Sequence, residues 1–373
     1  MQENIYKALG LTPIINAAGT FTELGGSLMP AEVVAASNAA SQHFVDFREL
    51  QDRVGQRIAE MLNVEAALVT GGAASGMMLA TAAAITQRDA DFVTRHATPD
   101  SQPPYEVIRQ RSHRDLYDRQ IETCGVRIVE VESERDLENR ISDRTVMLLS
   151  YNVYEPHSTI QRETWLRLAQ EHAVPTLLDA AADTPPVSNL WRFNQLGYDM
   201  VTFSGGKAIR GPQSSGLLLG RRELIAAAKR NAVPNEGVIG RVAKVSKEDI
   251  VGLWKALELF VGDGEHNGDH ISTRCLQQLQ IVQSELSDIQ TLQCTFITPD
   301  EANHFPHLKL LWDEQRLQLT ASELATQLRA GSPPIATGRV YGTGQDGLLI
   351  SAINLQPGEA EITGRRIREE LTR

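Results

Sequence analysis

The chain has 373 residues, 42% of them hydrophobic, which is enough for a large domain with a substantial core and a smaller second domain. Its formal net charge of −11 argues against broad non-specific binding of nucleic acid, which depends on Lys and Arg neutralising phosphates. The polar N-terminus has no signal-peptide core, and no apolar run approaches a membrane span. The three widely spaced cysteines predict neither a disulfide framework nor a metal site and favour a cytoplasmic protein.

The first hundred residues predict helices separated by short connections. An Ala-rich segment at 30–41 and an amphipathic one at 48–62 are expected to be helical. The apolar run Ala66–Thr70 predicts a strand that leads through two glycines into a further helix, from about residue 75 to 86. Residues Arg95–Gln110, which include three prolines, are expected to form a longer loop that shapes the substrate pocket.

The middle of the chain predicts buried strands separated by helices. A helical pattern covers Arg162–His172, and such alternation favours a mostly parallel sheet with helices on both faces. The run Ser215–Gly220 follows the preceding strand too closely for a parallel crossover, so we expect it to pair antiparallel. The expected strands are Val126–Val131, Val146–Ser150, Pro175–Asp179 and Met200–Ser204.

The C-terminal third predicts a helix at Ser246–Val261 that leads into a second α+β unit. We therefore expect a large α/β domain over 1–245, a connecting helix over 246–264 and a small domain over 265–373. In the small domain, strands are expected at His307–Leu311, Ile335–Tyr341 and Leu348–Ile353, and a closing helix at Gly358–Leu371.

A Ser-Gly-Gly-Lys sequence, Ser204 to Lys207, ends one of the expected strands. Ligands bind beyond the carboxyl ends of strands in open parallel sheets, and glycines let the backbone approach a ligand. A lysine there can form an imine with an aldehyde if its pKa is lowered. The alternative is a surface lysine that follows a turn.

Asp179 ends another expected strand and is followed by three alanines. A carboxylate at the end of a buried strand is costly unless it is paired. In enzymes that use pyridoxal 5′-phosphate (PLP), an acid keeps the pyridine nitrogen protonated. Asp179 could instead cap a following helix, and Asp183, which precedes two prolines in a loop, is a rival carboxylate.

A Gly-rich turn at 70–76, Thr-Gly-Gly-Ala-Ala-Ser-Gly, joins an expected strand to a helix. Backbone N–H groups at a helix N-terminus suit a phosphate. The turn lacks both the Walker A and the GxGxxG spacing, so a simple tight connection is an alternative. The order of a phosphate loop, a strand-end Asp and a strand-end Lys in one α/β domain nevertheless agrees with a PLP-binding fold.

Several stretches of the chain resemble the SelA-like branch of fold-type I PLP-dependent enzymes, which includes selenocysteine synthase and D-glucosaminate-6-phosphate ammonia-lyase-like proteins. The resemblance covers most of the large domain and is looser in the small one. The matching stretches are 15–20, 49–51, 70–76, His113-Arg114, 178–180, 204–207, 211–216 and 239–248.

The resemblance implies a role for individual residues. Lys207 is the Schiff-base lysine and Asp179 the partner of the pyridinium, while His113 packs on the cofactor ring unless it is an ordinary loop histidine. Three basic residues at a helix start, Arg241, Lys244 and Lys247, either face the active site, their own or a neighbour's, or are simply solvated. An arginine of the small domain could grip a substrate carboxylate. The phosphate contacts would be Ala73, Ala74, Ser75 and Ser204, and the basic substrate residues Arg241, Lys244 and Arg339.

The expected activity is that of a PLP-dependent lyase acting on a small amino acid or amino-sugar acid by α,β-elimination. Transamination and racemisation stay open because they share the same carbanion. A tRNA-dependent selenium transferase is less favoured, because the matching motifs begin near Ile14 and no basic patch of nucleic-acid size is evident. We expect a homodimer or higher homo-oligomer with no membrane partner.

Overall fold

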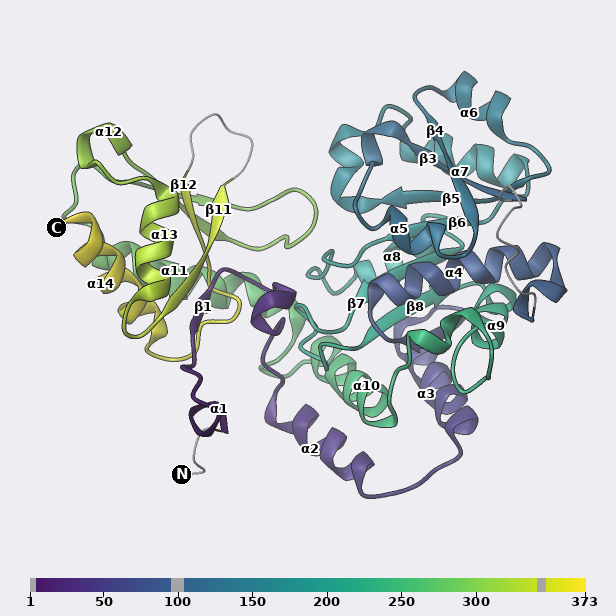
Figure 1. The fold of residues 1–373 in the computed structure, drawn as a ribbon, viewed down its shortest axis with the longest axis horizontal. Helices are drawn as coiled ribbons and strands as arrows, with labels where there is room; N and C mark the ends of the chain where they lie inside the picture. Colours follow the sequence, from purple (N-terminus) through teal and green to yellow (C-terminus); the bar gives the residue numbers. More distant parts are fainter. Residues whose placement is uncertain (1–4, 95–103, 341–346) are drawn as a thin grey trace. The chain divides into compact units, whose positions relative to one another are not determined.

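The computed structural model describes residues 5–94, 104–340 and 347–373, with only the backbone of Arg339 and Val340. They form two compact units, shown in Figure 1. The large unit comprises Met29–Gly268 and Asp300–Asn303; the small unit comprises Met1–Leu28, Asp269–Pro299 and His304–Arg373. Within the described ranges, every helix is too short or too polar to cross a membrane.

The large unit is built on a seven-stranded sheet in the order β2-β8-β7-β6-β5-β3-β4. All neighbouring strands are parallel except β8, which runs antiparallel to both β2 and β7. The expected parallel sheet and its antiparallel exception are therefore confirmed. The strands are β2 (Ala66–Thr70), β3 (Tyr105–Gln110), β4 (Val126–Val131), β5 (Thr145–Tyr151), β6 (Thr176–Asp179), β7 (Met200–Ser204) and β8 (Gly216–Gly220).

Helices cover both faces of this sheet, so its central strands are buried on both sides. On β5, Met147 and Leu149 face one apolar cluster while Leu148 faces the other. Burial on both faces explains why the sequence of β5 does not alternate between apolar and polar residues. The first cluster includes α4 (Ala73–Arg88), α5 (Asp118–Glu122) and α9 (Arg222–Arg230); the second includes α6 (Glu134–Arg140) and α7 (Arg162–Glu171), and α8 (Asn189–Gln195) packs on β7.

Three further helices of the large unit begin at recognisable caps or next to a proline. The Asp46 side chain accepts the Glu49 N–H at 2.9 Å at the start of α3, and Ser246 accepts the Asp249 N–H at 3.1 Å at the start of α10. Pro30 precedes the first residue of α2. α3 packs on β2 and α2 on α10. These helices are α2 (Ala31–Ser41), α3 (Phe47–Leu62) and α10 (Lys247–Val261).

The small unit has a five-stranded sheet in the order β1-β11-β12-β10-β9, in which β1 is parallel to β11 and the other neighbours are antiparallel. Its strands are β1 (Ile15–Ala17), β9 (Gln293–Ile297), β10 (His307–Leu311), β11 (Ile335–Val340) and β12 (Gly347–Ser351). Its helices are α1 (Ile5–Ala8), α11 (Ile271–Glu285), α12 (Glu314–Leu317), α13 (Ala321–Ala330) and α14 (Glu359–Leu371). The 3-10 helices of the chain are η1 (Thr22–Leu24), η2 (Ala90–Val93), η3 (Arg111–His113), η4 (Asn152–His157), η5 (Ile239–Val242) and η6 (Gly268–His270).

The expected domain boundaries differ from the structure in two places. Met1–Leu28 lies in the small unit and α10 in the large one, whereas the sequence grouped the first with the large domain and treated the second as a connection. Met1–Leu28 belongs to the small unit because its strand β1 pairs with β11, which lies far away in the sequence.

The expected loop Arg95–Gln110 also differs from the structure. Its last six residues form β3, which pairs with both β4 and β5; residues 95–103 lie outside the described ranges. Glu106 and Arg109 interrupt the apolar pattern of this strand. Both are buried because ion pairs with Arg127 and Glu130, respectively, compensate their charges.

Candidate active site

The strands of the large sheet other than β8 all end at one edge, and the register of β2, β5, β6 and β7 brings the expected site residues to that edge. Thr70 at the end of β2 and Ser204 at the end of β7 both pair with Gly216 at the start of β8. Asp179 at the end of β6 pairs with Thr202 of β7 on one side and with Tyr151 of β5 on the other. The Gly-rich turn, the Lys207 loop and Asp179 therefore share the carboxyl edge, where parallel sheets bind ligands.

The Gly-rich turn has the geometry of a cradle that suits an anion. α4 begins after Gly72, which has φ 114° and offers no side-chain cap, and its first helical bond runs from the Gly76 N–H to the Gly72 carbonyl at 3.0 Å. The N–H groups of Ala73, Ala74 and Ser75 precede that bond and suit a phosphate by helix geometry. The cradle is tight, because a Cβ on Gly216 would lie 2.3 Å from the Gly72 carbonyl carbon.

The Lys207 loop is held by close backbone packing. The Gly205 N–H donates to the Ser215 carbonyl at 2.9 Å, and the Gly211 N–H donates to the Gly205 carbonyl at 2.8 Å. A Cβ on Gly206 would lie 2.6 Å from the Cα of Gln213. Burial lowers the pKa of Lys207, which favours the neutral amine that imine formation requires.

Asp179 supplies a half-buried carboxylate near this lysine. Its Oδ1 accepts the Ala181 N–H at 2.8 Å. Burial raises the pKa of Asp179 to about 6, while the nearby Lys207 opposes that shift. A cationic pyridine nitrogen at this position would stabilise the ionised carboxylate. An amine nucleophile, a carboxylate and a phosphate cradle are the three groups that PLP requires, so the residues present fit this cofactor.

A second carboxylate, Asp183, is more deeply buried than the sequence suggested. It is 3% exposed, and its Oδ1 accepts hydrogen bonds from Asn152 Nδ2 at 2.8 Å and from the Ala302 N–H at 2.9 Å. Burial raises its pKa to about 6, and Lys207 again acts in the opposite direction. Sequence reasoning missed Asn152 and Ala302 altogether, since no local motif marks them.

His113 lies at the end of β5 rather than on an open surface. Its Nδ1 accepts the Tyr151 N–H at 3.2 Å and its Nε2 contacts the Ser158 hydroxyl at 2.8 Å, so the neutral tautomer that donates from Nε2 satisfies both contacts. Burial lowers the pKa of His113 to about 4. The residue is 0% exposed, so its expected packing on a cofactor ring stays a prediction that requires neighbouring groups to move.

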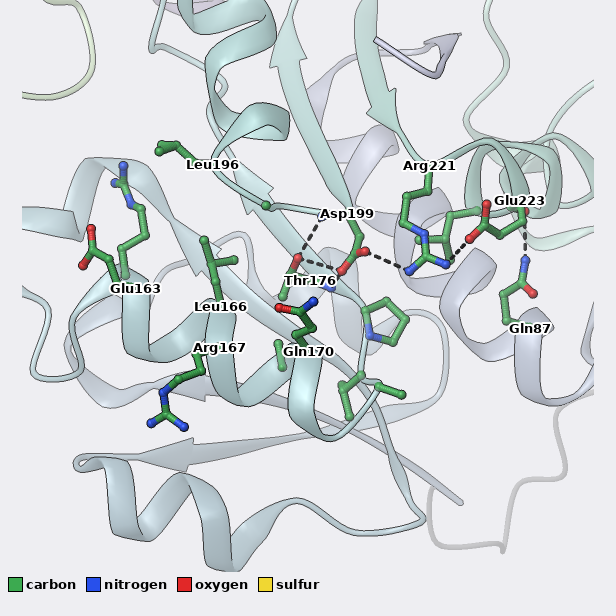
Figure 2. A pocket seen from close by; sticks show the side chains of 17 residues that line it. Gln87, Glu163, Leu166, Arg167, Gln170, Thr176, Leu196, Asp199, Arg221 and Glu223 are labelled. Carbon is green, nitrogen blue, oxygen red and sulfur yellow. Dashed lines mark hydrogen bonds and ion pairs between the residues drawn. The ribbon is translucent and has the colours of Figure 1, made fainter.

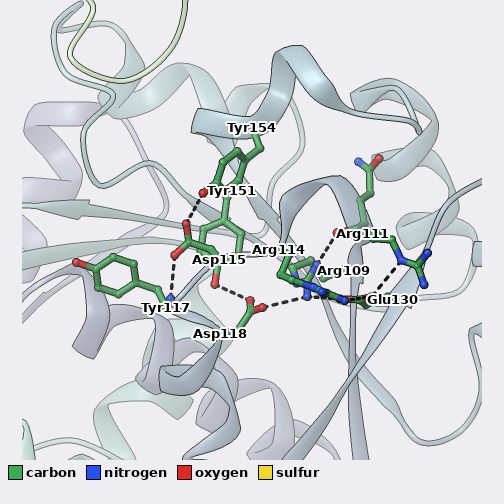
Figure 3. A network of polar contacts seen from close by, with 10 residues as sticks. Arg109, Arg111, Arg114, Asp115, Tyr117, Asp118, Glu130, Tyr151 and Tyr154 are labelled. Carbon is green, nitrogen blue, oxygen red and sulfur yellow. Dashed lines mark hydrogen bonds and ion pairs between the residues drawn. The ribbon is translucent and has the colours of Figure 1, made fainter. Parts of the chain in front are cut away.

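A polar network, shown in Figure 3, fixes the segment that follows β3. The buried Arg109 contacts Asp118 at 3.0 Å and Glu130 at 2.8 Å. The Tyr151 hydroxyl donates to Asp118 at 3.0 Å, and the Tyr154 hydroxyl donates to Asp115 at 2.7 Å. The network therefore joins the ends of β3, β4 and β5 beside Asp179.

The basic residues expected to bind substrate differ in their surroundings. Arg241 and Lys244 are exposed, and the chain between them passes the cradle, since a Cβ on Gly71 would lie 2.9 Å from the Ala243 carbonyl oxygen. Lys247 is instead held by the Ala40 carbonyl at 2.6 Å and by Glu248. Arg339 belongs to β11 of the small unit, and its side chain lies outside the described part of the chain.

A surface pocket of about 750 Å³ lies at the opposite, amino edge of the same sheet (Figure 2). Thr176 at the start of β6 and Asp199 before β7 line it. Asp199 accepts the Thr176 N–H at 2.8 Å and Arg221 Nη1 at 3.1 Å, so these polar groups are mutually satisfied. The described residues contain no cluster of three or more His, Cys, Asp or Glu suited to a metal ion.

Solved structures with the same architecture define the class of the protein. The chain matches "Structure of D-Glucosaminate-6-phosphate Ammonia-lyase" with a TM-score of 0.82 and 31% identity, covering 100% of this chain and 99% of that one. It also matches a Burkholderia pseudomallei sphingosine-1-phosphate lyase at a TM-score of 0.60 and 13% identity, over 99% and 88% of the two chains. The protein therefore has the fold of the fold-type I PLP-dependent enzymes.

Sequence comparison identifies the family. The model of "SelA: L-seryl-tRNA selenium transferase" matches residues 119–298. D-glucosaminate-6-phosphate ammonia lyase of Salmonella typhimurium is 32% identical over 99% of this chain and 98% of its own length. A 5′-C-glycyluridine monooxygenase-decarboxylase of a Streptomyces species is 28% identical over 98% and 92% of the two chains. The chain belongs to the SelA family of PLP-dependent enzymes.

Proposed function

We propose that this protein is a PLP-dependent lyase that acts on a small amino acid or amino-sugar acid by α,β-elimination. The observation that carries the proposal is the meeting of Lys207, Asp179 and the α4 N-terminus at one edge of the sheet. The lyase assignment is supported by the near full-length similarity to D-glucosaminate-6-phosphate ammonia lyase.

In this proposal the cofactor phosphate binds the N–H groups of Ala73, Ala74 and Ser75, with Ser204 as a further contact. Lys207 Nζ holds the cofactor carbonyl carbon, and the Asp179 carboxylate keeps a proton on the ring nitrogen. When bound, PLP supplies an electron sink for the electron pair of the substrate's broken Cα–H bond. Once the substrate amine has displaced it, Lys207 Nζ takes the α-proton as the general base. The β-substituent then leaves with the electron pair of its bond to the β-carbon, and hydrolysis of the product releases ammonia and a keto acid.

The substrate in this proposal carries an anionic group. Arg241 and Lys244 are exposed near the cradle, and Arg339 is a further candidate for a substrate carboxylate. The two positive charges of Arg241 and Lys244 would suit an anionic group such as a phosphate. A phosphate is part of the substrate named by the Salmonella relative.

Other reactions would use the same lysine and aspartate. Transamination and racemisation begin with loss of the same α-proton. The Streptomyces relative is named for an oxidative decarboxylation, and the matching family model for selenium transfer to seryl-tRNA. The products must therefore distinguish the proposed elimination from these other reactions.

The deciding experiment incubates the PLP-loaded protein with D-glucosaminate 6-phosphate, with the unphosphorylated acid and with common amino acids. Elimination should release ammonia and a keto acid in equal amounts without oxygen or an added amino acceptor. The Lys207→Ala variant is the control and should release neither. A keto acid that forms only when an acceptor is present would favour transamination, and oxygen consumption would favour the oxidative reaction.

A further inference from the structure

Arg162, the first residue of α7, binds two side chains of η4, the segment that follows β5. Its Nε forms an ion pair with Glu155 at 3.3 Å, and its Nη2 donates to Asn152 Oδ1 at 2.8 Å. The guanidinium also lies over the Phe193 ring, 5.8 Å from the centroid. The Arg162 side chain is only 13% exposed, so these partners replace most of the water around its charge.

The contact with Glu155 connects Arg162 to His113. The Tyr151 N–H can only donate, so His113 Nδ1 accepts it at 3.2 Å and the ring carries its proton on Nε2. Nε2 then donates to the Ser158 hydroxyl at 2.8 Å, and this hydroxyl donates to Glu155 Oε2 at 3.3 Å. Every hydrogen in this series therefore has a defined acceptor, and the series ends on the carboxylate that Arg162 binds.

The contact with Asn152 connects Arg162 to the loop that follows β6. Because Arg162 occupies Oδ1 of this amide, its Nδ2 faces two carboxylates, Asp183 at 2.8 Å and Glu301 at 2.6 Å. Asn152 is 0% exposed and Asp183 is 3% exposed, so water cannot readily replace these hydrogen bonds.

The loop after β6 holds the carboxylate of Asp179. The Asp183 N–H donates to the Ala180 carbonyl at 3.1 Å and closes a turn. Within this turn the Ala181 N–H donates to Asp179 Oδ1 at 2.8 Å, and the Ala181 carbonyl accepts the Ser204 N–H at 3.3 Å. The orientation of Asp179 therefore depends on a loop that the Asn152 amide fastens.

We propose that Arg162 is a positioning residue of the candidate active site, which orients His113 through Glu155 and Asp179 through Asn152. An arginine suits this role because its planar fork presents separate N–H groups to two acceptors in fixed directions, whereas a lysine has a single nitrogen. The inference rests on the proposed function only for what the two oriented groups do. Their connection to Arg162 is a property of this chain's own contacts.

Two backbone amides report on the two groups separately. The Tyr151 N–H donates to His113 and the Ala181 N–H donates to Asp179. Their hydrogen exchange in the cofactor-free full-length protein, corrected for intrinsic rates, therefore measures how well each group is held. The Leu148 N–H, which is bonded within the same sheet at 2.9 Å, is the reference for global unfolding.

Arg162→Met removes the guanidinium and keeps an apolar side chain against Phe193. Relative to the reference amide, Tyr151 and Ala181 should both lose protection by roughly tenfold or more. Arg162→Lys, which keeps the charge but has one nitrogen, should loosen at least one of them and serves if Arg162→Met does not fold. Arg167→Met is the matched control on the same helix, because Arg167 also pairs with two carboxylates, and it should change neither amide.

Two single variants test the branches. Glu155→Ala should lower the protection of Tyr151 alone, and Asn152→Ala that of Ala181 alone. Tyr151 and Ala181 amides that change only in step with the reference, or full protection of both in a folded Arg162 variant, would overturn the proposal.

The PLP-loaded protein gives a second measurement. Arg162→Met should lower kcat by roughly tenfold with little change in KM, because the catalytic groups are misaligned while the substrate contacts stay. A wild-type protein that binds no PLP would contradict the proposed function, whereas the two amides decide the role of Arg162 without the cofactor.

Discussion

Lys207 is the residue on which the proposed chemistry depends. Three features point to this lysine: the end of a strand, two preceding glycines and a nearby carboxylate. Burial lowers the pKa of its amine, so the neutral form is accessible at a lower pH than for a surface lysine. A structural role alone would require neither the close approach of Gly206 to Gln213 nor the acidic neighbours.

The first prediction is that borohydride fixes PLP to Lys207 and that peptide mapping finds the label there. The Lys207→Ala variant should lose the label and lower turnover by roughly 10²–10⁴-fold, as expected for loss of a general base. Lys247 is a useful comparison, because its ammonium is already held by Ala40 and Glu248. A label that maps to Lys247, or label retained in Lys207→Ala, would contradict the assignment.

The second prediction concerns the pH dependence of Asp179. Its folded-state pKa of about 6 lies above the ordinary value of 3.8, so the folded protein keeps a proton that the unfolded chain has released. This contribution to stability is present below about pH 4 and is lost as the pH rises through about 6. Asp179→Asn should therefore raise the unfolding free energy of the cofactor-free protein at pH 8, on the order of 1–3 kcal/mol.

The same variant should bind PLP more weakly and lose most turnover, since a neutral amide does not stabilise a cationic ring nitrogen. Urea unfolding at pH 4 and pH 8, with and without PLP, separates the two effects. Asp199→Asn is the matched control at the opposite edge of the sheet, where a carboxylate accepts the Thr176 N–H, and it should lower stability. An Asp179→Asn enzyme with normal rates would move the role to Asp183.

At the scale of elements, the connection from β2 to α4 illustrates what local sequence predicts well. The Ala-rich composition and the glycine pair predict a strand, a turn and a helix, and the structure has all three. Gly216 is different, because its closeness to Gly72 arises from the pairing of β8 with β2. No local pattern around residue 216 predicts that contact.

The third prediction follows from this close approach. Gly216→Ala places a Cβ 2.3 Å from the Gly72 carbonyl carbon, so the cradle must shift. We expect a loss of about 1–3 kcal/mol in unfolding free energy and weaker PLP binding. Gly264→Ala is the control, since a Cβ there meets nothing within 4 Å. Calorimetry and PLP titration of both variants provide the measurement, and an unchanged Gly216→Ala protein would show that the cradle tolerates displacement.

The elements that sequence reasoning misjudged were those stabilised by distant partners. β1 has three residues and depends on β11, and β3 carries buried charges that depend on β4. The same reason applies to the site. The local sequence predicts Lys207 and Asp179 as site residues because each follows or ends a strand. Asn152 and Glu301, in contrast, are brought to Asp183 only by the fold.

At the scale of the whole molecule, large apolar side chains remain exposed on the large unit. Phe44 is 100% exposed, Val242 88% and Leu116 85%. Val242 neighbours Arg241, and Leu116 follows the polar segment after β3. An interface with another copy of the chain would cover such side chains.

The fourth prediction is that the active protein is at least a dimer and that each site draws on its neighbour. Mixing inactive Lys207→Ala with inactive Arg241→Ala should restore part of the activity, because some sites would take both intact residues from different chains. Subunit exchange must be demonstrated independently. A fully active monomer in dilute solution, or no recovery despite exchange, would exclude a shared site.

The position of β8 between β2 and β7 has a consequence for how the protein forms during synthesis. β2 has β8 as its neighbour in the sheet, and Thr70 pairs with Gly216. A chain still emerging from the ribosome therefore holds its Gly-rich turn unpaired until β8 has been made, and such long-range pairing is slow. Capture of a cofactor by the proposed site would then be a late step, and a chain cut before β8 would carry Lys207 without the partner strand of the Gly-rich turn.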